Sequence, residues 1–93
     1  MRTIKQTGQF KRDYKRELKG KHKKTVADDL KAALSLLLND ADLPAKYFDH
    51  VMIGNWNDHR NCHIKPDLVL IYRLTDDESL QLVRLGSHSE LGI

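Results

Sequence analysis

Leu68-Val69-Leu70-Ile71-Tyr72 is the longest apolar run of the chain, and it decides the fold. A short apolar run bounded by turn signals is typical of a β-strand that is buried on both faces. The preceding Lys65-Pro66-Asp67 predicts a hairpin turn. After a polar turn at residues 75–79, the apolar residues of 80–85 predict a last strand that ends at Gly86. Strands joined by such short turns must be antiparallel.

Upstream of these strands, the spacing of the apolar residues changes to that of a helix. Phe10, Tyr14 and Leu18 recur every four residues, which predicts an amphipathic helix. Thr7 is its expected N-cap, because a threonine hydroxyl can accept a hydrogen bond from the first turn. Gly20 is expected to end it.

A second helix is predicted to begin near Thr25. Thr25 to Asp28 has the spacing of a capping box, with aspartate in place of the usual glutamate or glutamine. Asn39, Asp40 and Pro44 are expected to close the helix. Its expected buried stripe consists of Val26, Leu30, Ala33, Leu34 and Leu37.

Residues 3–6 are predicted to form a short first strand. The polar segment from Trp56 to Ile64, which is bounded by turn signals, is predicted to be the strand that precedes the hairpin turn. The predicted fold class is therefore α+β, in the order β-α-α-β-β-β, within one domain that spans residues 1–93. The two helices are expected to cover one face of a small, mainly antiparallel sheet. The other face is expected to remain free for a functional site.

The charge of the chain is divided unevenly. The first 24 of the 93 residues carry ten Lys and Arg against Asp13 and Glu17, whereas the rest carries six basic and eleven acidic residues. A basic arm suits a phosphate-rich partner, because Lys and Arg neutralise phosphates and release counterions. A solvated helix face is the alternative explanation of such a run, and charge alone does not decide between the two.

The compartment can also be predicted. The N-terminal residues 1–6 contain no apolar core of signal-peptide length, and five apolar residues are far fewer than the roughly 20 that span a bilayer. The single cysteine, Cys62, cannot form an internal disulfide, which favours a reducing compartment. We expect a soluble cytoplasmic protein.

The chain contains five histidines, which is a high number for its length: His22, His50, His59, His63 and His88. His59, Cys62 and His63 raise the possibility of a zinc site. On a strand, however, neighbouring side chains point to opposite faces, and residues four apart are roughly 13 Å from each other. We therefore predict no metal and no cofactor, and we expect Cys62 to behave as a small core residue.

The remaining chemical groups suit the cleavage of RNA by its own 2′-hydroxyl. This reaction needs a base, an acid and positive charge at the phosphate. Histidine can act as acid or base near neutral pH, and arginine can hold two phosphate oxygens. The predicted catalytic residues, expected to share one pocket, are His50, His63, Asp67, Arg84 and His88.

Several stretches together are similar to a known family. They are Asp49-His50, Gly54-Asn55-Trp56, Arg60, His63-Ile64-Lys65-Pro66-Asp67, Ile71-Tyr72-Arg73-Leu74 and Arg84-Leu85-Gly86-Ser87-His88-Ser89-Glu90-Leu91. On these residues the chain resembles the YafQ branch of the RelE/ParE toxin superfamily. The turn His-x-x-Pro-Asp followed by Arg-x-Gly-x-His is specific in combination.

This resemblance implies a ribosome-dependent mRNA endonuclease that works in the decoding site and is silenced by a cognate DinJ-like antitoxin. The acid, base and positive charge described above need no metal, so the expected enzyme is metal-independent. His88 matches the imidazole with the acid/base role, and Arg84 matches the residue that steadies the phosphate. The N-terminal basic helix would then face ribosomal RNA. Its predicted RNA-binding residues are Lys11, Lys15, Lys19 and Lys23.

Three positions depart from the family pattern. Leu68 stands where relatives often have Trp, His59 stands where an aromatic is common, and the tail Leu91-Gly92-Ile93 lacks the Phe that would pack near the substrate base. We read His59 as structural or incidental, and we expect looser base selection. Two other functions fit the same fold: a non-enzymatic inhibitor like the gyrase-poisoning ParE branch, and a plain RNA- or protein-binding module. The catalytic set favours the nuclease.

Overall fold

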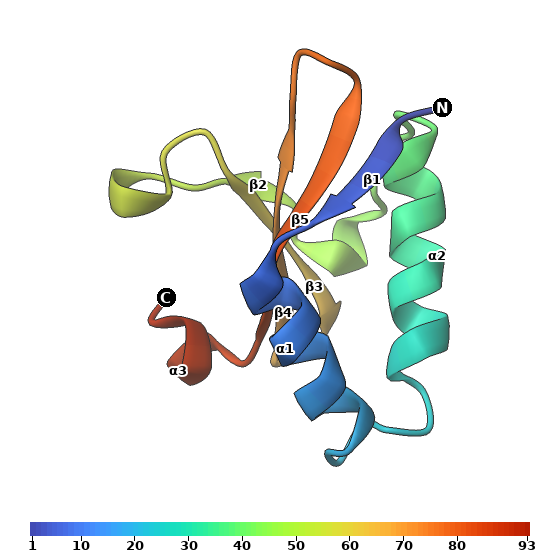
Figure 1. The fold of residues 1–93 in the computed structure, drawn as a ribbon, viewed down its shortest axis with the longest axis vertical. Helices are drawn as coiled ribbons and strands as arrows, with labels where there is room; N and C mark the ends of the chain where they lie inside the picture. The colour runs from blue at the N-terminus through green and yellow to red at the C-terminus, as the bar shows by residue number, and fades with distance from the viewer.

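A five-stranded mixed sheet forms the centre of the structure, a computed structural model that describes residues 1–93 (Figure 1). The strand order is β1-β5-β4-β3-β2; β1 runs parallel to β5 and the other neighbours are antiparallel. The strands are β1 (Thr3–Gln6), β2 (His50–Val51), β3 (Arg60–Lys65), β4 (Leu68–Leu74) and β5 (Ser79–Gly86). The predicted α+β class and the mainly antiparallel sheet are confirmed.

The central strand β4 is buried on both faces, as its apolar run predicts. Leu68, Leu70 and Tyr72 belong to the main core on one face of the sheet. Val69 and Ile71 belong to a second, smaller cluster on the other face. The alternation of side chains along a strand explains this division. Residues 66–67 form the turn between β3 and β4, also as expected.

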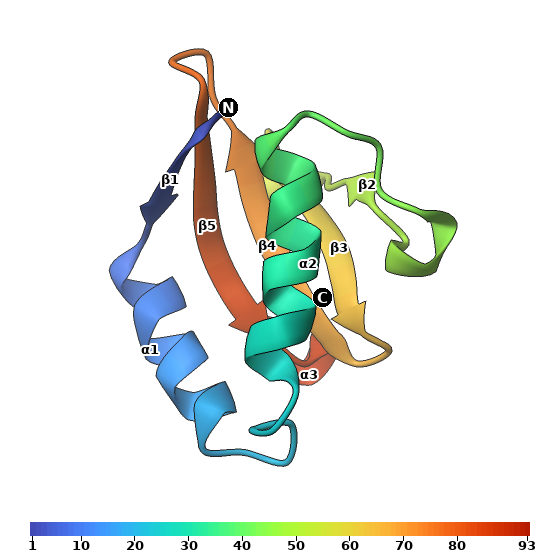
Figure 2. The same cartoon turned by 90° about the vertical axis from the view of Figure 1, so that its right-hand side faces the viewer.

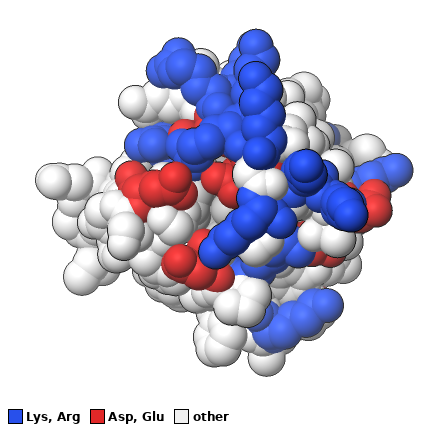
Figure 3. Space-filling view, turned by 90° about the horizontal axis from the view of Figure 1, so that it is seen from below, with Lys and Arg blue, Asp and Glu red and all other residues white.

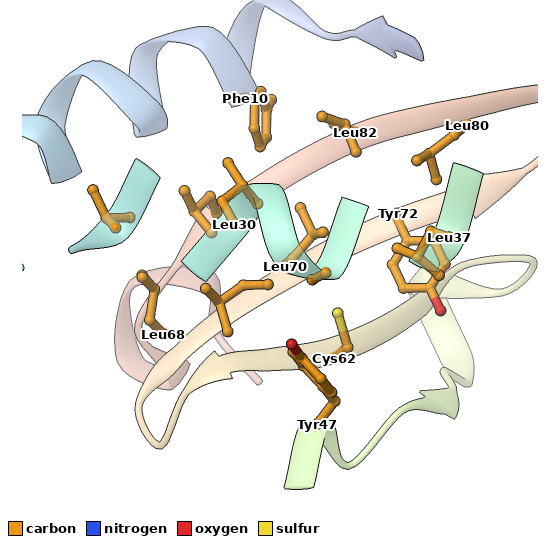
Figure 4. Packing of buried hydrophobic residues seen from close by; sticks show 14 residues of the cluster. Phe10, Leu30, Leu37, Tyr47, Cys62, Leu68, Leu70, Tyr72, Leu80 and Leu82 are labelled. Carbon is orange, nitrogen blue, oxygen red and sulfur yellow. The ribbon is translucent and has the colours of Figure 1, made fainter. Parts of the chain in front are cut away.

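Helices α1 (Gly8–Leu18) and α2 (Val26–Leu38) cover the main-core face (Figure 2). The Thr7 hydroxyl accepts a hydrogen bond from the N–H of Phe10 at 3.0 Å, so the predicted N-cap is confirmed. In Figure 4, Phe10 and Leu30 point from the two helices toward the sheet residues Leu70 and Leu82. Leu18 was expected on the same stripe but is 41% exposed, because the end of α1 projects past the sheet.

The start of α2 differs from the predicted capping box. Thr25 is the N-cap, but its side chain makes no capping hydrogen bond. The reason is its backbone, with φ −126° and ψ −14°, which lies outside the extended region that directs an N-cap side chain at the first turn. Hydrogen bonds from the N–H groups of Thr25 and Val26 to the carbonyl of His22 form a turn there instead. The predicted apolar stripe is buried, apart from Leu34, which is half-buried.

Several short elements were absent from the predicted order. They are β2, the 3-10 turns η1 (Ala45–Tyr47) and η2 (Gly54–Trp56), and the single-turn helix α3 (His88–Leu91). Elements this short are held by pairing and capping contacts and not by hydrophobic periodicity, so the sequence gives little signal for them. The second face of the sheet is also not fully free, because Met52 and Leu91 pack there on Val69 and Ile71. No helix has both the length and the apolar character needed to cross a bilayer.

Candidate active site

The register of β4 and β5 brings Asp67 and His88 together. Val69 pairs with Gly86 and Leu70 with Leu85 in this antiparallel ladder. Continuing the same register by two residues places position 67 opposite position 88. The backbone N–H of His88 donates to Asp67 Oδ1 at 3.2 Å, and Nδ1 of the His88 ring lies 2.7 Å from the same oxygen. These hydrogen bonds lower the pKa of Asp67, so its carboxyl is ionised at neutral pH.

The backbone that carries His88 is fixed by a capping box at the start of α3. The Ser87 hydroxyl accepts from the N–H of Glu90 at 3.1 Å, and the Glu90 carboxylate accepts from the N–H of Ser87 at 2.8 Å. With Nδ1–H donating to Asp67, the tautomer of the His88 ring is set, and Nε2 is left for another partner. The imidazole is therefore held at one nitrogen and available at the other.

His63 supplies a second imidazole beside the first. It lies on β3 opposite Val69, and its ring centroid is 5.0 Å from that of His88. Partial burial lowers the pKa of His63, and the neighbouring rings of His88 and His50 lower it further by charge repulsion. At neutral pH this ring is therefore mainly unprotonated and able to accept a proton.

His50 is placed beside these groups by β2. It pairs with Asn61, two residues before His63 on β3, which puts both histidines on the same face of the sheet. Its Nδ1 lies 2.7 Å from the carbonyl oxygen of Phe48. The preceding Asp49 accepts a hydrogen bond from Arg60 at 2.8 Å and another from the Tyr72 hydroxyl, which anchors this short strand.

Arg84 is held on a different partner. It lies on β5 opposite Ile71, but its Nε donates to Asp13 Oδ2 at 2.7 Å, and its Nη2 donates to Asp13 Oδ1 at 3.3 Å. Hydrogen bonds to Asp13 raise the pKa of Arg84, so its positive charge is secure. Of the five predicted catalytic residues, the structure thus brings four together (His50, His63, Asp67 and His88) and ties the fifth to helix α1.

Asp13 is the structural residue that the sequence analysis missed. Its side chain is nearly buried, with 5% exposed, and it also accepts from the N–H of Leu85 at 3.0 Å and from Arg16 at 3.0 Å. Burial alone would raise the pKa of Asp13, but the hydrogen bonds from Arg84 and Leu85 and the charges of both arginines lower it overall. The available signal was its position three residues after Phe10, which places an acid near the buried stripe of a basic helix.

Arg16 extends this network from α1 to the end of the sheet and to α3. One of its Nη atoms donates to the carbonyl oxygen of Leu85 at 2.8 Å, and its Nε lies 3.3 Å from the Glu90 carboxylate. Glu90 in turn caps Ser87, directly before His88. Helix α1 therefore contacts the segment that carries His88.

The four lysines predicted to bind RNA lie on or just after α1. Lys11 and Lys15 are in the helix, Lys19 is its C-cap and Lys23 is in the turn before α2; all four are exposed. Figure 3 shows Lys and Arg side chains spread over this end of the molecule, with a few acidic groups between them. The arm lies close to the site, since the charge of Lys21 contributes to the lowered pKa of Asp67.

The residues considered for zinc do not converge. Cys62 is fully buried in the main core, whereas His63, its neighbour on β3, lies on the opposite face. Burial raises the pKa of the Cys62 thiol to about 12, so it stays protonated. His59 contacts the Asn57 carbonyl and the edge of Trp56, which agrees with a structural role. Nowhere do three His, Cys, Asp or Glu side chains meet in a metal-binding group.

Position 68 has a different environment from the one that the resemblance implied. Leu68 is 2% exposed and packs in the main core beneath the helices, so a larger ring there would crowd the core and not reach a substrate base. At the tail, Gly92 has φ +71°, a conformation that strains any side chain. Neither position is suited to restoring an aromatic contact by substitution.

A match to a family model defines the class of this protein, a bacterial toxin of a type II toxin–antitoxin system. The family model described as "Bacterial toxin of type II toxin-antitoxin system, YafQ" matches residues 2–92. The chain is 41% identical over 91 residues to the mRNA interferase toxin YafQ of Escherichia coli K12, covering 97% of this chain and 95% of that one. The chain belongs to the YafQ toxin family.

Solved structures agree with this assignment. The toxin in a crystal structure of the Escherichia coli DinJ-YafQ complex superposes with a TM-score of 0.84 and 38% identity, covering 98% of both chains. A metal-bound toxin from Helicobacter pylori superposes with a TM-score of 0.83 and 40% identity, covering 98% of this chain and 99% of that one. The mixed sheet and its helices are therefore shared with toxins of known structure.

Proposed function

We propose that this toxin is a ribosome-dependent endonuclease that cleaves mRNA in the decoding site through attack by the RNA's own 2′-hydroxyl. The observation that carries the proposal is the pairing of two imidazoles: His88, hydrogen-bonded to Asp67 at 2.7 Å, and His63, with its ring centroid 5.0 Å away. The name of the Escherichia coli relative, an mRNA interferase, supports the same activity. The protein would act in the cytoplasm, where translating ribosomes are found.

The two imidazoles suit opposite halves of the reaction. His63, with its lowered pKa, accepts the proton of the 2′-hydroxyl as the oxygen attacks phosphorus. His88, held through Nδ1 by Asp67, donates a proton from Nε2 to the departing 5′ oxygen. The P–O5′ bond breaks, and the products carry a 2′,3′-cyclic phosphate and a 5′-hydroxyl. His50 completes the cluster beside His63.

Arg84 is proposed to stabilise the negative charge that grows on the phosphate. Its Nε and Nη2 face Asp13, and its side chain is still 22% exposed, which leaves part of the guanidinium for a substrate oxygen. In this arrangement Asp13 orients the guanidinium of Arg84, and the exposed part of that guanidinium donates to the phosphate oxygens. The reaction needs no metal for its chemistry, since histidines supply the proton transfers.

Replacing His88 by alanine tests the acid/base assignment. The loss of a positioned acid typically lowers the rate by about 10²–10⁴. We expect His88→Ala to lose that much in single-turnover cleavage of ribosome-bound mRNA, while ribosome binding is retained. His59→Ala is the matched control, because His59 contacts only Asn57 and Trp56, and it should cleave at the wild-type rate.

The chemistry of the products and the metal dependence complete this test. The wild-type products should carry 2′,3′-cyclic phosphate ends, and a chelator that spares the ribosome's magnesium should leave the rate unchanged. Cleavage by His88→Ala at near the wild-type rate would move the role to His50 or His63. If the wild type does not cleave at all, the protein is a non-enzymatic inhibitor or a binding module on this fold.

We infer that the exposed basic arm binds ribosomal RNA. Lys11, Lys15 and Lys19 follow one another at four-residue spacing on or at the end of α1, which places them on one side of the helix. Each phosphate contact that is lost should reduce the salt dependence of binding by about 0.7–0.9 in the log–log slope. Replacing all three by glutamate should therefore weaken ribosome binding and flatten its salt dependence while the fold is kept. An unchanged slope would contradict this role. The same measurement on Lys23→Glu tests the fourth predicted lysine.

The partner that silences the toxin is proposed to be a cognate DinJ-like antitoxin. The support is the DinJ-YafQ complex, whose toxin shares 38% identity and nearly its whole length with this chain. We also infer that the family is a branch of the RelE/ParE superfamily, on the motifs of the hairpin turn and the last strand. Copurification of the toxin with a coexpressed DinJ-like antitoxin would test the partnership directly.

A further inference from the structure

An exposed aromatic ring extends the row of catalytic rings. Phe48 is 65% exposed, and its ring centroid lies 5.3 Å from that of His63, at an interplanar angle of 47°. His63 in turn lies 5.0 Å from His88. Phe48, His63 and His88 thus form a row of three rings that begins at the proposed general acid. A single exposed apolar residue is common on protein surfaces, so it is the contact of Phe48 with His63, and not its exposure alone, that points to a function.

The position of Phe48 is fixed by its backbone and not only by its ring contact. It has φ +48°, a left-handed conformation that is uncommon for a bulky residue and that clusters at functional sites. Its N–H donates to the carbonyl of Ala45 at 3.0 Å, and its carbonyl oxygen is 2.7 Å from Nδ1 of His50. The next residue, Asp49, is anchored by Arg60 and Tyr72. The ring is therefore held outward by contacts on both sides.

A hollow of ≈600 Å³ opens beside this ring. Phe48, His63 and Pro66 line it together with Lys46 and the Lys65–Asp29 ion pair. The Lys65 ammonium donates a hydrogen bond to the Asp29 carboxylate, which neutralises its charge. Lys46, in contrast, forms no ion pair, and its ammonium lies 5.3 Å from the centroid of the Tyr47 ring. The hollow therefore offers an aromatic wall and one available cation, next to a proposed catalytic histidine.

We propose that this hollow is a nucleotide subsite, in which a base of the mRNA next to the cleaved phosphate stacks on Phe48 and Lys46 meets a flanking phosphate. The inference rests on the proposed function, since it takes the scissile phosphate to lie at His63 and His88. Aromatic rings bind single-stranded bases in a sequence-tolerant way, because every base has a π-face. Phe48 thereby becomes a substrate-positioning residue.

The competing occupant is a protein. Val51 is 60% and Ile53 is 89% exposed, so the segment 48–53 presents other apolar side chains near Phe48. A docking surface for a protein would use these residues along with the ring. The row of rings and the available Lys46 favour RNA, and Ile53 provides a matched control because it is apolar, exposed and outside the hollow.

Two measurements test the subsite. The first is single-turnover cleavage of ribosome-bound mRNA. A lost stack corresponds to about 5- to 150-fold, so Phe48→Ala should cleave more slowly within that range. Phe48→Trp should retain the wild-type rate, and Phe48→Leu, which keeps the bulk without the π-face, should resemble Phe48→Ala. Ile53→Ala should have no effect. The His50 ring contacts the backbone carbonyl of residue 48, so no substitution of the residue 48 side chain removes this hydrogen bond.

The second measurement does not depend on cleavage. A ribosome-bound oligoribonucleotide with a 2′-deoxy sugar at the cut site and 2-aminopurine beside it should lose fluorescence when the wild type or Phe48→Trp binds, but not when Phe48→Ala binds. If the wild type quenches but never cleaves intact mRNA, the proposed function fails and the subsite stands. If the wild type gives no quenching, or if Phe48→Ala quenches and cleaves like the wild type, the subsite is overturned. An equal loss of cleavage in Ile53→Ala and Phe48→Ala would also overturn it, in favour of protein docking.

Discussion

Two aspartates each orient one of the predicted catalytic residues, but one aspartate is buried and the other is exposed. Asp13 has 5% of its side chain exposed and accepts hydrogen bonds from Arg84, Arg16 and the backbone of Leu85. Asp67 has 62% of its side chain exposed and accepts from His88 alone. Both carboxylates orient a side chain at the end of β5. Only Asp13 is enclosed by the elements that form the fold.

This difference predicts a division of labour between stability and chemistry. A buried carboxylate that satisfies two arginines and a backbone N–H leaves several groups without partners when it is removed. An exposed carboxylate can be replaced by water as far as the fold is concerned. The Asp13 network should therefore dominate the free energy of unfolding, and the Asp67 contact should matter mainly for the orientation of the His88 ring.

The largest effect is expected from Asp13→Ala. Breaking a buried charge pair costs about 3–5 kcal/mol, and the partial exposure of both arginines places this case near the lower value, about 3 kcal/mol. Urea denaturation followed by circular dichroism should show this loss. Asp67→Ala, the matched change at the exposed aspartate, should leave the unfolding midpoint unchanged. Equal midpoints for the two variants would remove the distinction between the two aspartates.

A smaller effect is expected on the cleavage rate from Asp67→Asn. The amide keeps the size of the side chain but loses the negative charge that faces Nδ1 of His88. Because the pair is exposed and screened by solvent, a loss of about 5-fold is expected in single-turnover cleavage. Thermal stability should not change. A loss as large as that of His88→Ala would show that the carboxylate takes a direct part in proton transfer.

The two networks should also respond to acid in different pH ranges. His63 has a lowered pKa, so its neutral form persists below the usual value of 6.5, and the acid limb of cleavage should lie below pH 6.5. Asp13 also has a lowered pKa, so its stabilisation is complete above the unfolded value of about 3.8 and is lost as the pH falls through the folded value. Activity should thus be lost on acidification before the fold is. Rate–pH profiles and unfolding curves at each pH would show the order.

The smallest effect should come from His50→Gln. The charge of His50 is one of the causes that lower the pKa of His63, so its removal should move the acid limb slightly toward higher pH. The acid limb should still lie above the pH range in which the fold is lost. A shift toward lower pH would contradict the arrangement of these two rings.

The sequence predicted those parts of the fold that are determined locally. The run at residues 68–72 reads as a buried strand because its neighbours are turn residues, and Thr7 reads as a cap because its hydroxyl acts within one turn. The meeting of Asp67 and His88 was also within reach, because both flank strands joined by a short turn. These features depend on contacts between residues close in the chain or in one ladder.

The features that were missed depend on tertiary contacts. Asp13 reads as a solvated acid in a basic helix, and only the packing of α1 against β5 makes it buried. Thr25 has the residue type for a capping box, but the preceding turn gives it the wrong backbone angles. Phe48 carries no motif, and its left-handed backbone and ring contact arise from the turn that positions it. Apart from the spacing of Asp13 from Phe10, no pattern in the chain reports such placements.

The contacts between α1 and the end of β5 also govern how other chains can join this sheet. Past the end of the short β1, side chains occupy the backbone groups along the edge of β5. The Thr7 hydroxyl donates to the Val83 carbonyl, Asp13 accepts from the N–H of Leu85, and Arg16 donates to the Leu85 carbonyl. An exposed strand edge is a template for strand addition and aggregation, and covering it removes that hazard. A partner that binds by adding a strand must therefore use the outer edge of β1 or β2, or displace helix α1.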